Sequence, residues 1–192
     1  MNQSQQQAKL YLEQQLSSSY PGMSINQEGS DGLSLEIVKD EIYIHIDAKE
    51  LNSAIENGQT MTGVVCNAGG AGLVDNNPTV SSISENGELG SQITLCCSAD
   101  TNGFEILHDV VDKIDVGISN WNGIGFSDGA AGIVYAADAF LQEHPACAKD
   151  FKLYLADGAW TQPEQFQNHE ALERHKDDIE MYFTIANSED PY

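Results

Sequence analysis

Basic residues are scarce in this sequence. Its 192 residues include 8 Lys and Arg against 30 Asp and Glu, which gives a formal net charge of −22 at pH 7. Arg174 is the one arginine, and neither Lys nor Arg occurs from Ala54 to Asp112. Nucleic-acid backbones and anionic membranes are bound through clustered Lys and Arg, so we expect no direct nucleic-acid binding and no membrane binding. The negative field favours a basic protein as the partner.

The sequence also lacks a membrane-length apolar run, and its first residues lack the basic and apolar regions of an export signal. We therefore expect a cytoplasmic protein. The four cysteines, Cys66, Cys96, Cys97 and Cys147, do not have the spacing of a disulfide framework, and we expect reduced, partly buried thiols. Cysteines and histidines give no closed ligand set for zinc, so no metal and no cofactor is predicted.

The composition is that of a folded protein, with 41% hydrophobic and 20% charged residues. The length and the absence of a long linker predict one domain over 1–192. The order of the elements predicts an α+β fold: an antiparallel sheet in the first half, with an N-terminal helix and C-terminal helices packed on it. Helical and strand patterns do not alternate regularly, which disfavours a doubly wound parallel sheet.

Hydrophobic periodicity places the individual elements. Helices are expected at 4–16, 48–56, 106–114, 130–143 and 163–183, the last from the capping signal Thr161-Gln162-Pro163-Glu164. Strands are expected at 33–37 and 42–46, which form a hairpin, at 62–66, 79–83 and 93–97, which form a small antiparallel sheet, and at 151–155. The segment 117–129 is too glycine-rich to continue a helix and is expected to be irregular.

Two segments match known binding motifs in part. Val64 to Gly72 resembles the Asn-Ala-Gly segment of short-chain dehydrogenases, whose glycines lie between a strand and a helix and bind a dinucleotide. Here Pro78 and polar turn residues follow, and a glycine-rich sheet turn is the alternative. Ser98 to Asp109 matches five positions of a calcium-binding loop, and a turn that caps the next helix is the alternative.

The leading functional prediction is an acidic cytosolic protein-binding module: an inhibitor, immunity protein or chaperone that acts on a basic partner surface, including by mimicry of nucleic-acid charge. Aromatic residues amid negative charge are typical of such surfaces. The charge is similar to that of small acidic immunity and inhibitor proteins, and the helix-then-hairpin opening is similar to small secretion chaperones. The predicted partner-binding residues are Trp121, Phe126, Glu170, Glu173, Asp177 and Asp178.

Two other functions are kept beside it. The first is a divalent-metal-dependent hydrolase, because carboxylates suit hard cations. Its candidate ligands are Asp100, Asp109, Asp112 and Asp115. The second is a structural or assembly component, which would form a stable homo-oligomer. No complete catalytic set is recognised in the sequence, so no catalytic residue is predicted and a binding protein is favoured over an enzyme.

Overall fold

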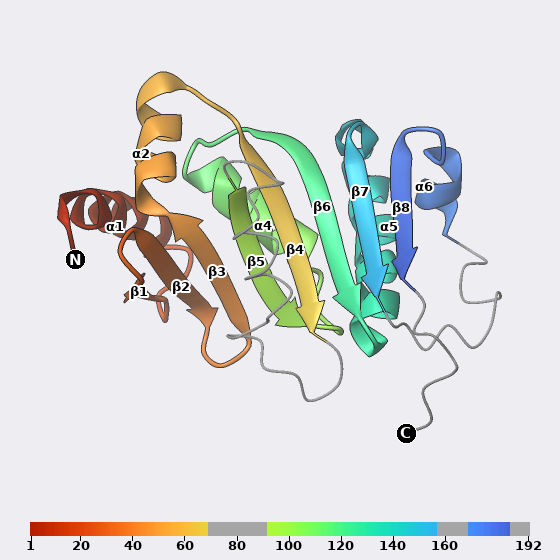
Figure 1. The fold of residues 1–192 in the computed structure, drawn as a ribbon, viewed down its shortest axis with the longest axis horizontal. Helices are drawn as coiled ribbons and strands as arrows, with labels where there is room; N and C mark the ends of the chain where they lie inside the picture. Colours follow the sequence, from red (N-terminus) through yellow and green to blue (C-terminus); the bar gives the residue numbers. More distant parts are fainter. Residues whose placement is uncertain (69–91, 157–168, 185–192) are drawn as a thin grey trace.

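An eight-stranded sheet forms the centre of the molecule in this computed structural model, which describes residues 1–68, 92–156 and 169–184. Its strands are β1 Ser24–Glu28, β2 Gly32–Val38, β3 Ile42–Asp47, β4 Met61–Ala68, β5 Gln92–Ser98, β6 Ile118–Phe126, β7 Phe151–Ala156 and β8 Ile179–Thr184. The described helices are α1 Gln3–Leu16, α2 Ala48–Asn57, α4 Gly103–Lys113, α5 Asp128–Glu143, the 3-10 helix η1 Pro145–Ala148 and α6 Glu170–Arg174. The strand order is β1-β2-β3-β5-β4-β6-β7-β8 (Figure 1).

The sheet is mixed, and most of it is parallel. Strands β1, β2, β3 and β5 pair antiparallel in that order. From β5 onward every pair is parallel: β5 with β4, β4 with β6, β6 with β7, and β7 with β8. The protein therefore has a mixed α/β fold. The prediction of an antiparallel sheet is confirmed for the pairs among β1, β2, β3 and β5, and it is wrong for the other pairs, which are parallel. The second half of the chain alternates strand and helix, which a parallel sheet requires.

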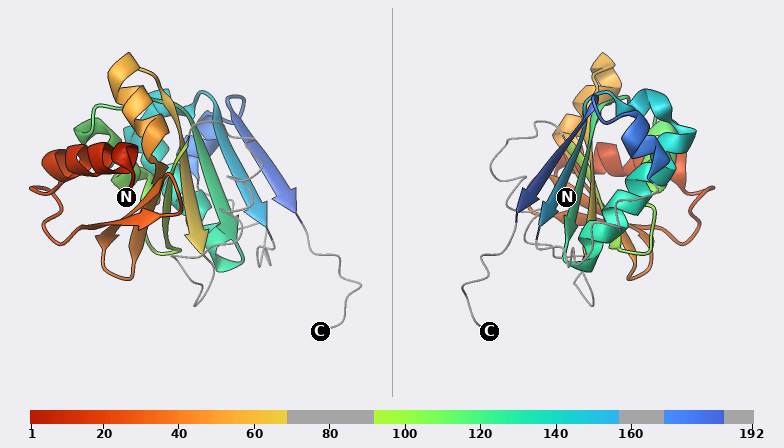
Figure 2. Two further views of the ribbon diagram at one scale, coloured as in Figure 1. Left: turned by 60° about the vertical axis from the view of Figure 1, so that its left-hand side comes forward. Right: turned by 90° about the vertical axis from the view of Figure 1, so that its right-hand side faces the viewer.

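The main core lies between one face of the sheet and a layer of helices. In the right-hand view of Figure 2, α5 and α6 lie on one side of the parallel strands. Strand residues Leu95 and Leu153 and helix residues Phe104 and Phe140 are fully buried in this core. A smaller cluster of buried residues occupies the opposite face of the sheet, with Tyr154 packed against it; its members are Val64, Cys66, Cys96 and Ile124. Side chains that alternate along a strand thus point into two different clusters, one on each face of the sheet.

The N-terminal predictions are confirmed. Helix α1 and the β2–β3 hairpin occupy the expected residues. Asp47 caps the start of helix α2: its carboxylate accepts hydrogen bonds from the N–H groups of Lys49 and Glu50 at 2.8 and 3.0 Å. Gly58 caps the end of the helix, and its φ of 61° is the left-handed value that glycine adopts without a Cβ clash.

Three predictions in the later chain are wrong. The segment 117–129 is not irregular, because β6 and the start of α5 fill it. Strands β4 and β5 are parallel, so they do not form the predicted antiparallel sheet. Within the described part of 163–183, the helix extends only over α6, and Ile179 begins the edge strand β8. The predicted strand 79–83 and the capping signal at 161–164 lie outside the described residues.

Asp138 ties α6 to α5. Its side chain is buried, with 5% exposure, and one carboxylate oxygen accepts hydrogen bonds from the N–H groups of Ala171 and Leu172 at 3.0 Å each. The other oxygen accepts a hydrogen bond from the Gln142 side chain at 2.8 Å. The carboxylate thus satisfies donors at the start of α6 that have no partner within the helix.

Asp138→Ala is expected to lower the free energy of unfolding by about 2 kcal/mol, because it leaves these buried N–H groups without an acceptor. Urea unfolding measures the loss. Asp112→Ala on the exposed side of α4 is the matched control and is expected to change stability by less than about 0.5 kcal/mol. Equal effects of the two substitutions would contradict the capping role of Asp138.

Candidate active site

A sharp turn at Ser127 joins β6 to α5. Ser127 has φ 53° and ψ −124°, whereas the strand before it and the helix after it have regular geometry. Its N–H donates to the carbonyl oxygen of Ala156 at 3.0 Å, and its own carbonyl accepts from the N–H of Ala130 at 3.0 Å. The chain therefore changes from strand to helix at one residue, on the carboxyl edge of the sheet beside the end of β7.

The backbone of Ser127 is strained. Asp40, Asp115 and Asp150 also have positive φ, but aspartate tolerates the left-handed region through local hydrogen bonds. Ser127 combines positive φ with a ψ far from that region, a combination that residues with a Cβ rarely adopt. Such a conformation costs about 1 to 3 kcal/mol and persists where the surrounding structure imposes it, often at functional sites.

Glycines allow α5 to begin directly against β6. A Cβ on Gly125 would lie 2.5 Å from both the Cα of Ala130 and the carbonyl oxygen of Gly129. A Cβ on Gly132 would lie 2.5 Å from the carbonyl oxygen of Ala99, in the turn between β5 and α4. Because these contacts are with backbone, larger residues would push α5 away and open the turn at Ser127.

The five residues of this turn, Gly125-Phe126-Ser127-Asp128-Gly129, have the pattern G-x-S-x-G. In this pattern a strained strand-to-helix turn presents the serine hydroxyl above the sheet as a nucleophile. The side chain of Ser127 is partly exposed and makes no capping hydrogen bond to α5. The G-x-S-x-G pattern is visible in the sequence, but it indicates a nucleophile only where a strand precedes it and a helix follows it.

Asp128 supplies a hydrogen-bond donor beside the serine. It is the first residue of the sixteen-residue helix α5, so its N–H has no acceptor within the helix. The amino end of α5 also carries the positive end of the helix dipole. In a serine nucleophile turn, the N–H that follows the serine stabilises the oxyanion of the tetrahedral intermediate. The position of Asp128 fits that role.

Buried polar groups line the sheet beneath the turn. In the register of the parallel strands, Asn67 lies beside Gly125 on one side and beside Cys97 on the other. The Cys97 thiol donates to the Asn67 side-chain oxygen at 3.2 Å, and Asn67 is fully buried. Burial raises the pKa of Cys97 to about 12, so this thiol stays neutral and is a poor nucleophile.

The contacts that the structure describes for the histidines are with groups other than Ser127. His169 lies 3.9 Å from the Asp138 carboxylate and packs on the Tyr135 ring. Asp138 follows Ser127 by eleven residues, which places it roughly 16 Å along α5. The rings of His108 and His144 are in contact, with 4.2 Å between their centroids and a tilt of 33°, and His144 lies just past the far end of α5.

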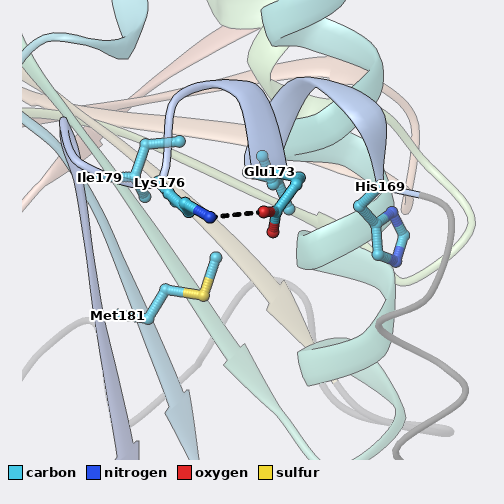
Figure 3. A pocket seen from close by; sticks show the side chains of 6 residues that line it. His169, Glu173, Lys176, Ile179 and Met181 are labelled. Atoms are coloured by element: carbon cyan, nitrogen blue, oxygen red, sulfur yellow. Dashed lines mark hydrogen bonds and ion pairs between the residues drawn. The ribbon is translucent and has the colours of Figure 1, made fainter.

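A pocket of about 360 Å³ lies between α6 and β8. Figure 3 shows the Lys176 and Glu173 side chains paired, with Met181 below them. The Lys176 nitrogen lies 2.7 Å from the Glu173 carboxylate oxygen. Its lining residues are His169, Leu172, Glu173, Lys176, Ile179 and Met181. Ser127 is not among them, so this pocket is separate from the strained turn.

The predicted partner-binding residues are divided between the core and two surface regions. Trp121 is a core residue with 4% exposure, packed on Phe104 and Phe140 at 6.3 and 5.2 Å between ring centroids, and cannot anchor a partner. Phe126 is 46% exposed beside Ser127, whereas Glu170 and Glu173 are on α6. Asp177 and Asp178 follow that helix. A partner surface at these exposed residues stays a prediction.

The alternative metal ligands do not assemble. The Asp109 carboxylate is held by the Tyr20 hydroxyl and the Lys113 ammonium, while Asp112 and Asp115 are exposed elsewhere on the same segment. In the part of the chain that the structure describes, no group of three or more His, Cys, Asp or Glu could hold a metal ion. Likewise, Asn102 of the calcium-loop match caps α4 through the N–H of Glu105.

Comparisons with known proteins find similarity at the level of structure. No protein-family profile and no curated protein matches the sequence. The chain is similar to Est1E from Butyrivibrio proteoclasticus, with 14% identity, a TM-score of 0.38, and coverage of 72% of this chain and 51% of that one. It is also similar to MGS-M1, an α/β hydrolase from a Medee basin deep-sea metagenome, with 13% identity, a TM-score of 0.41, and coverage of 86% of this chain and 83% of that one. The similarity to FphF, a fluorophosphonate-binding serine hydrolase of Staphylococcus aureus, has 8% identity, a TM-score of 0.42, and coverage of 87% of this chain and 91% of that one.

The chain thus spans about half the length of Est1E. Similarity at this level transfers no activity. The predicted acidic protein-binding module finds no support in these comparisons: the similar structures that they name are α/β hydrolases, serine hydrolases and esterases. The described part of the chain contains no helix both long and apolar enough to span a membrane. The cytoplasmic location and the basic partner stay predictions.

Proposed function

We propose that this protein is a serine hydrolase that cleaves carboxylic esters through a covalent acyl intermediate on Ser127. The observation that carries the proposal is the backbone of Ser127, held at φ 53° and ψ −124° between β6 and α5 within a G-x-S-x-G sequence. A strained serine at a strand-to-helix turn is costly in free energy, and a nucleophile that must stand above the sheet explains that cost.

In the proposed reaction, the Ser127 hydroxyl oxygen bonds to the ester carbonyl carbon while a general base takes its proton. The carbonyl oxygen becomes an oxyanion, to which the N–H of Asp128 donates a hydrogen bond. The carbon–oxygen bond to the alcohol then breaks, and the alcohol leaves with the proton. Water releases the acid in a second step and restores the serine.

A fluorophosphonate probe tests the nucleophile directly, because it phosphonylates activated serines and displaces fluoride. We expect one probe molecule per chain, on the peptide that contains Ser127, and a burst of alcohol release from an activated acetate ester. An ordinary serine, without a base, reacts with neither reagent at a measurable rate. A chain that is folded by circular dichroism but neither labels nor shows the burst would refute the proposed function.

The acidity of the chain predicts which esters react fastest. With a net charge of −22, the protein attracts cationic substrates and repels anionic ones. Among acetate esters whose alcohols differ only in charge, we expect kcat/KM to be about tenfold higher for the cationic than for the anionic ester at low salt. The ratio is expected to approach one near 0.5 M salt, since the charges are then screened within about 5 Å. Steady-state kinetics across a salt series measures it, and a neutral ester is the control.

A further inference from the structure

Phe126, the residue before Ser127, has its phenyl ring on the face of the sheet opposite to α5. Gly125 faces α5, and side chains alternate along a strand, so Phe126 points to the same face as Ile124. The ring is 46% exposed. Its partner on β7 is Ala156, whose methyl group is too small to cover it. A large apolar side chain is thus left uncovered one residue from the proposed nucleophile.

Ala156 also fixes where this ring lies relative to the turn. The Ser127 N–H donates to the Ala156 carbonyl oxygen at 3.0 Å, so the end of β7 lies directly beside the nucleophile. The Cα atoms of Phe126 and Ser127 are consecutive and therefore about 3.8 Å apart. A chain of a few carbons bonded to the Ser127 hydroxyl oxygen can therefore reach the Phe126 ring.

Two tyrosines continue the apolar surface across β7 and β8. Tyr154 is the register partner of Ile124, and Tyr182 is the partner of Tyr154. The two tyrosine rings stack with 5.0 Å between their centroids and 9° between their planes, and Tyr182 is 44% exposed. Adjacent strands are about 4.8 Å apart, so Phe126 and Tyr182 are about 10 Å apart across the sheet. The rings of Phe126, Tyr154 and Tyr182 are the aromatic surface.

A charged pair marks the far end of the aromatic surface. The Lys152 Nζ lies 3.5 Å from a Glu180 carboxylate oxygen, and the Tyr182 hydroxyl donates to the same carboxylate. Lys152 and Glu180 are register partners two residues before the tyrosines, so they lie on the same face of the sheet. The face is therefore apolar beside Ser127 and charged further away, which suits a ligand of limited apolar length.

We infer that the aromatic surface binds the acyl chain of the substrate, so that esters of medium-length alkyl acids react faster than acetate esters. This inference rests on the proposed function. The acyl group is the part of the ester that stays bonded to Ser127 after the alcohol leaves, and its chain begins beside Phe126. Neighbouring exposed apolar side chains are typical of ligand-binding surfaces, and an alkyl chain that lies on them removes their rings from water.

The expected preference follows from the area that the chain buries. Full burial of a methylene group changes an equilibrium about fourfold, and a chain that lies on one surface buries about half of each methylene. We therefore expect kcat/KM to rise about twofold for each methylene, or about sixteenfold from acetate to hexanoate. The rise is expected to end with longer chains, because these reach the charged pair of Lys152 and Glu180.

The experiment measures kcat/KM for 4-nitrophenyl acetate, butyrate, hexanoate and octanoate. Phe126→Ala is expected to lower the ratio of hexanoate to acetate to below about fourfold. Tyr182→Ala is expected to lower the value for octanoate more than that for butyrate. Leu10→Ala is the matched control, because it removes an apolar side chain that is 58% exposed on α1, and it is expected to retain the wild-type ratio.

The ratio separates binding of the chain from damage to the turn, since a variant that only displaces Ser127 slows all the esters equally. A second series varies the alcohol of acetate esters and is expected to show no dependence on Phe126. With labelling and the acetate burst intact, the inference is overturned by a wild-type ratio near one, by an unchanged ratio in Phe126→Ala, or by a preference that follows the alcohol. The proposed function stands in each of these cases.

Binding tests the aromatic surface even where labelling and the burst fail. Ser127→Ala lacks the proposed nucleophile, so ethyl hexanoate can be titrated onto it and followed by NMR. We expect the ring signals of Phe126 and Tyr182 to shift, and Phe126→Ala in the same background to weaken binding at least about fourfold. Shifts that are confined to other residues would overturn the inference, whatever the result at Ser127.

Discussion

Ser127→Ala is expected to lower kcat/KM for ester hydrolysis by a factor of at least about 10³ and to abolish labelling by a fluorophosphonate. The substitution removes the one oxygen that can bond to the acyl carbon, and it leaves the rest of the turn in place. Activity is measured with an activated acetate ester, and labelling by intact mass. Ser17→Ala is the control, because that serine caps the far end of α1 through the Glu13 carbonyl.

A second substitution at the same position separates strain from chemistry. Ser127→Gly removes the hydroxyl too, but glycine adopts positive φ without a Cβ clash. We therefore expect the glycine variant to be more stable than the alanine variant by about 1 kcal/mol, although both are inactive. Urea unfolding of the pair measures the difference. If the alanine variant were the more stable, the turn would store no strain and the argument for a built nucleophile would fail.

An element of the fold can be predicted from the sequence when the residues that determine it lie within or next to that element. Helix α1 and the β2–β3 hairpin follow from apolar spacing within the segment itself, and the end of α2 follows from Gly58. These elements are predicted correctly, because the residues that fix them are neighbours in the sequence.

The prediction for the segment of strand β6 is wrong because the cause of its structure lies in residues far away in the sequence. Its glycines indicate an irregular segment when read alone. In the structure, a Cβ on Gly123 would lie 2.6 Å from the Leu153 side chain and 2.9 Å from the Phe104 ring, so these positions are glycine because distant residues fill the space. The same error hides the candidate site, since the Gly125–Gly129 pattern indicates a nucleophile only after a strand.

The acidic C-terminal part shows a second limit. Residues after Arg174 have the polar composition of an exposed helix, and the sequence predicts one. Ile179 and Met181 instead alternate on β8 and pack against the core from a sheet edge. A short alternating run next to charged residues fits both the helical and the strand period. This run forms a strand because it pairs with the edge of β7. Likewise, Trp121 is equally plausible as an anchor or a core residue until β6 is placed.

Gly125→Ala is expected to have the largest effect on stability, with a loss of about 3 kcal/mol in the free energy of unfolding and with loss of probe labelling. The added Cβ would meet the Ala130 Cα and the Gly129 carbonyl oxygen at 2.5 Å, and backbone cannot rotate away as a side chain can. Helix α5 must therefore shift, and Ser127 shifts with its first turn. Gly22→Ala is the matched control, because a Cβ there meets nothing within 4 Å.

Gly63→Ala provides an intermediate case, since its Cβ would lie 3.0 Å from the Trp121 ring, well away from the turn. We expect it to lower stability by about 1 kcal/mol while labelling of Ser127 persists. The series thus distinguishes a general packing defect, which lowers stability alone, from a defect at the turn, which lowers stability and reactivity together. If the Gly125 variant were to label as well as the Gly63 variant at a temperature where both are folded, close packing of α5 on β6 would not be what holds the nucleophile.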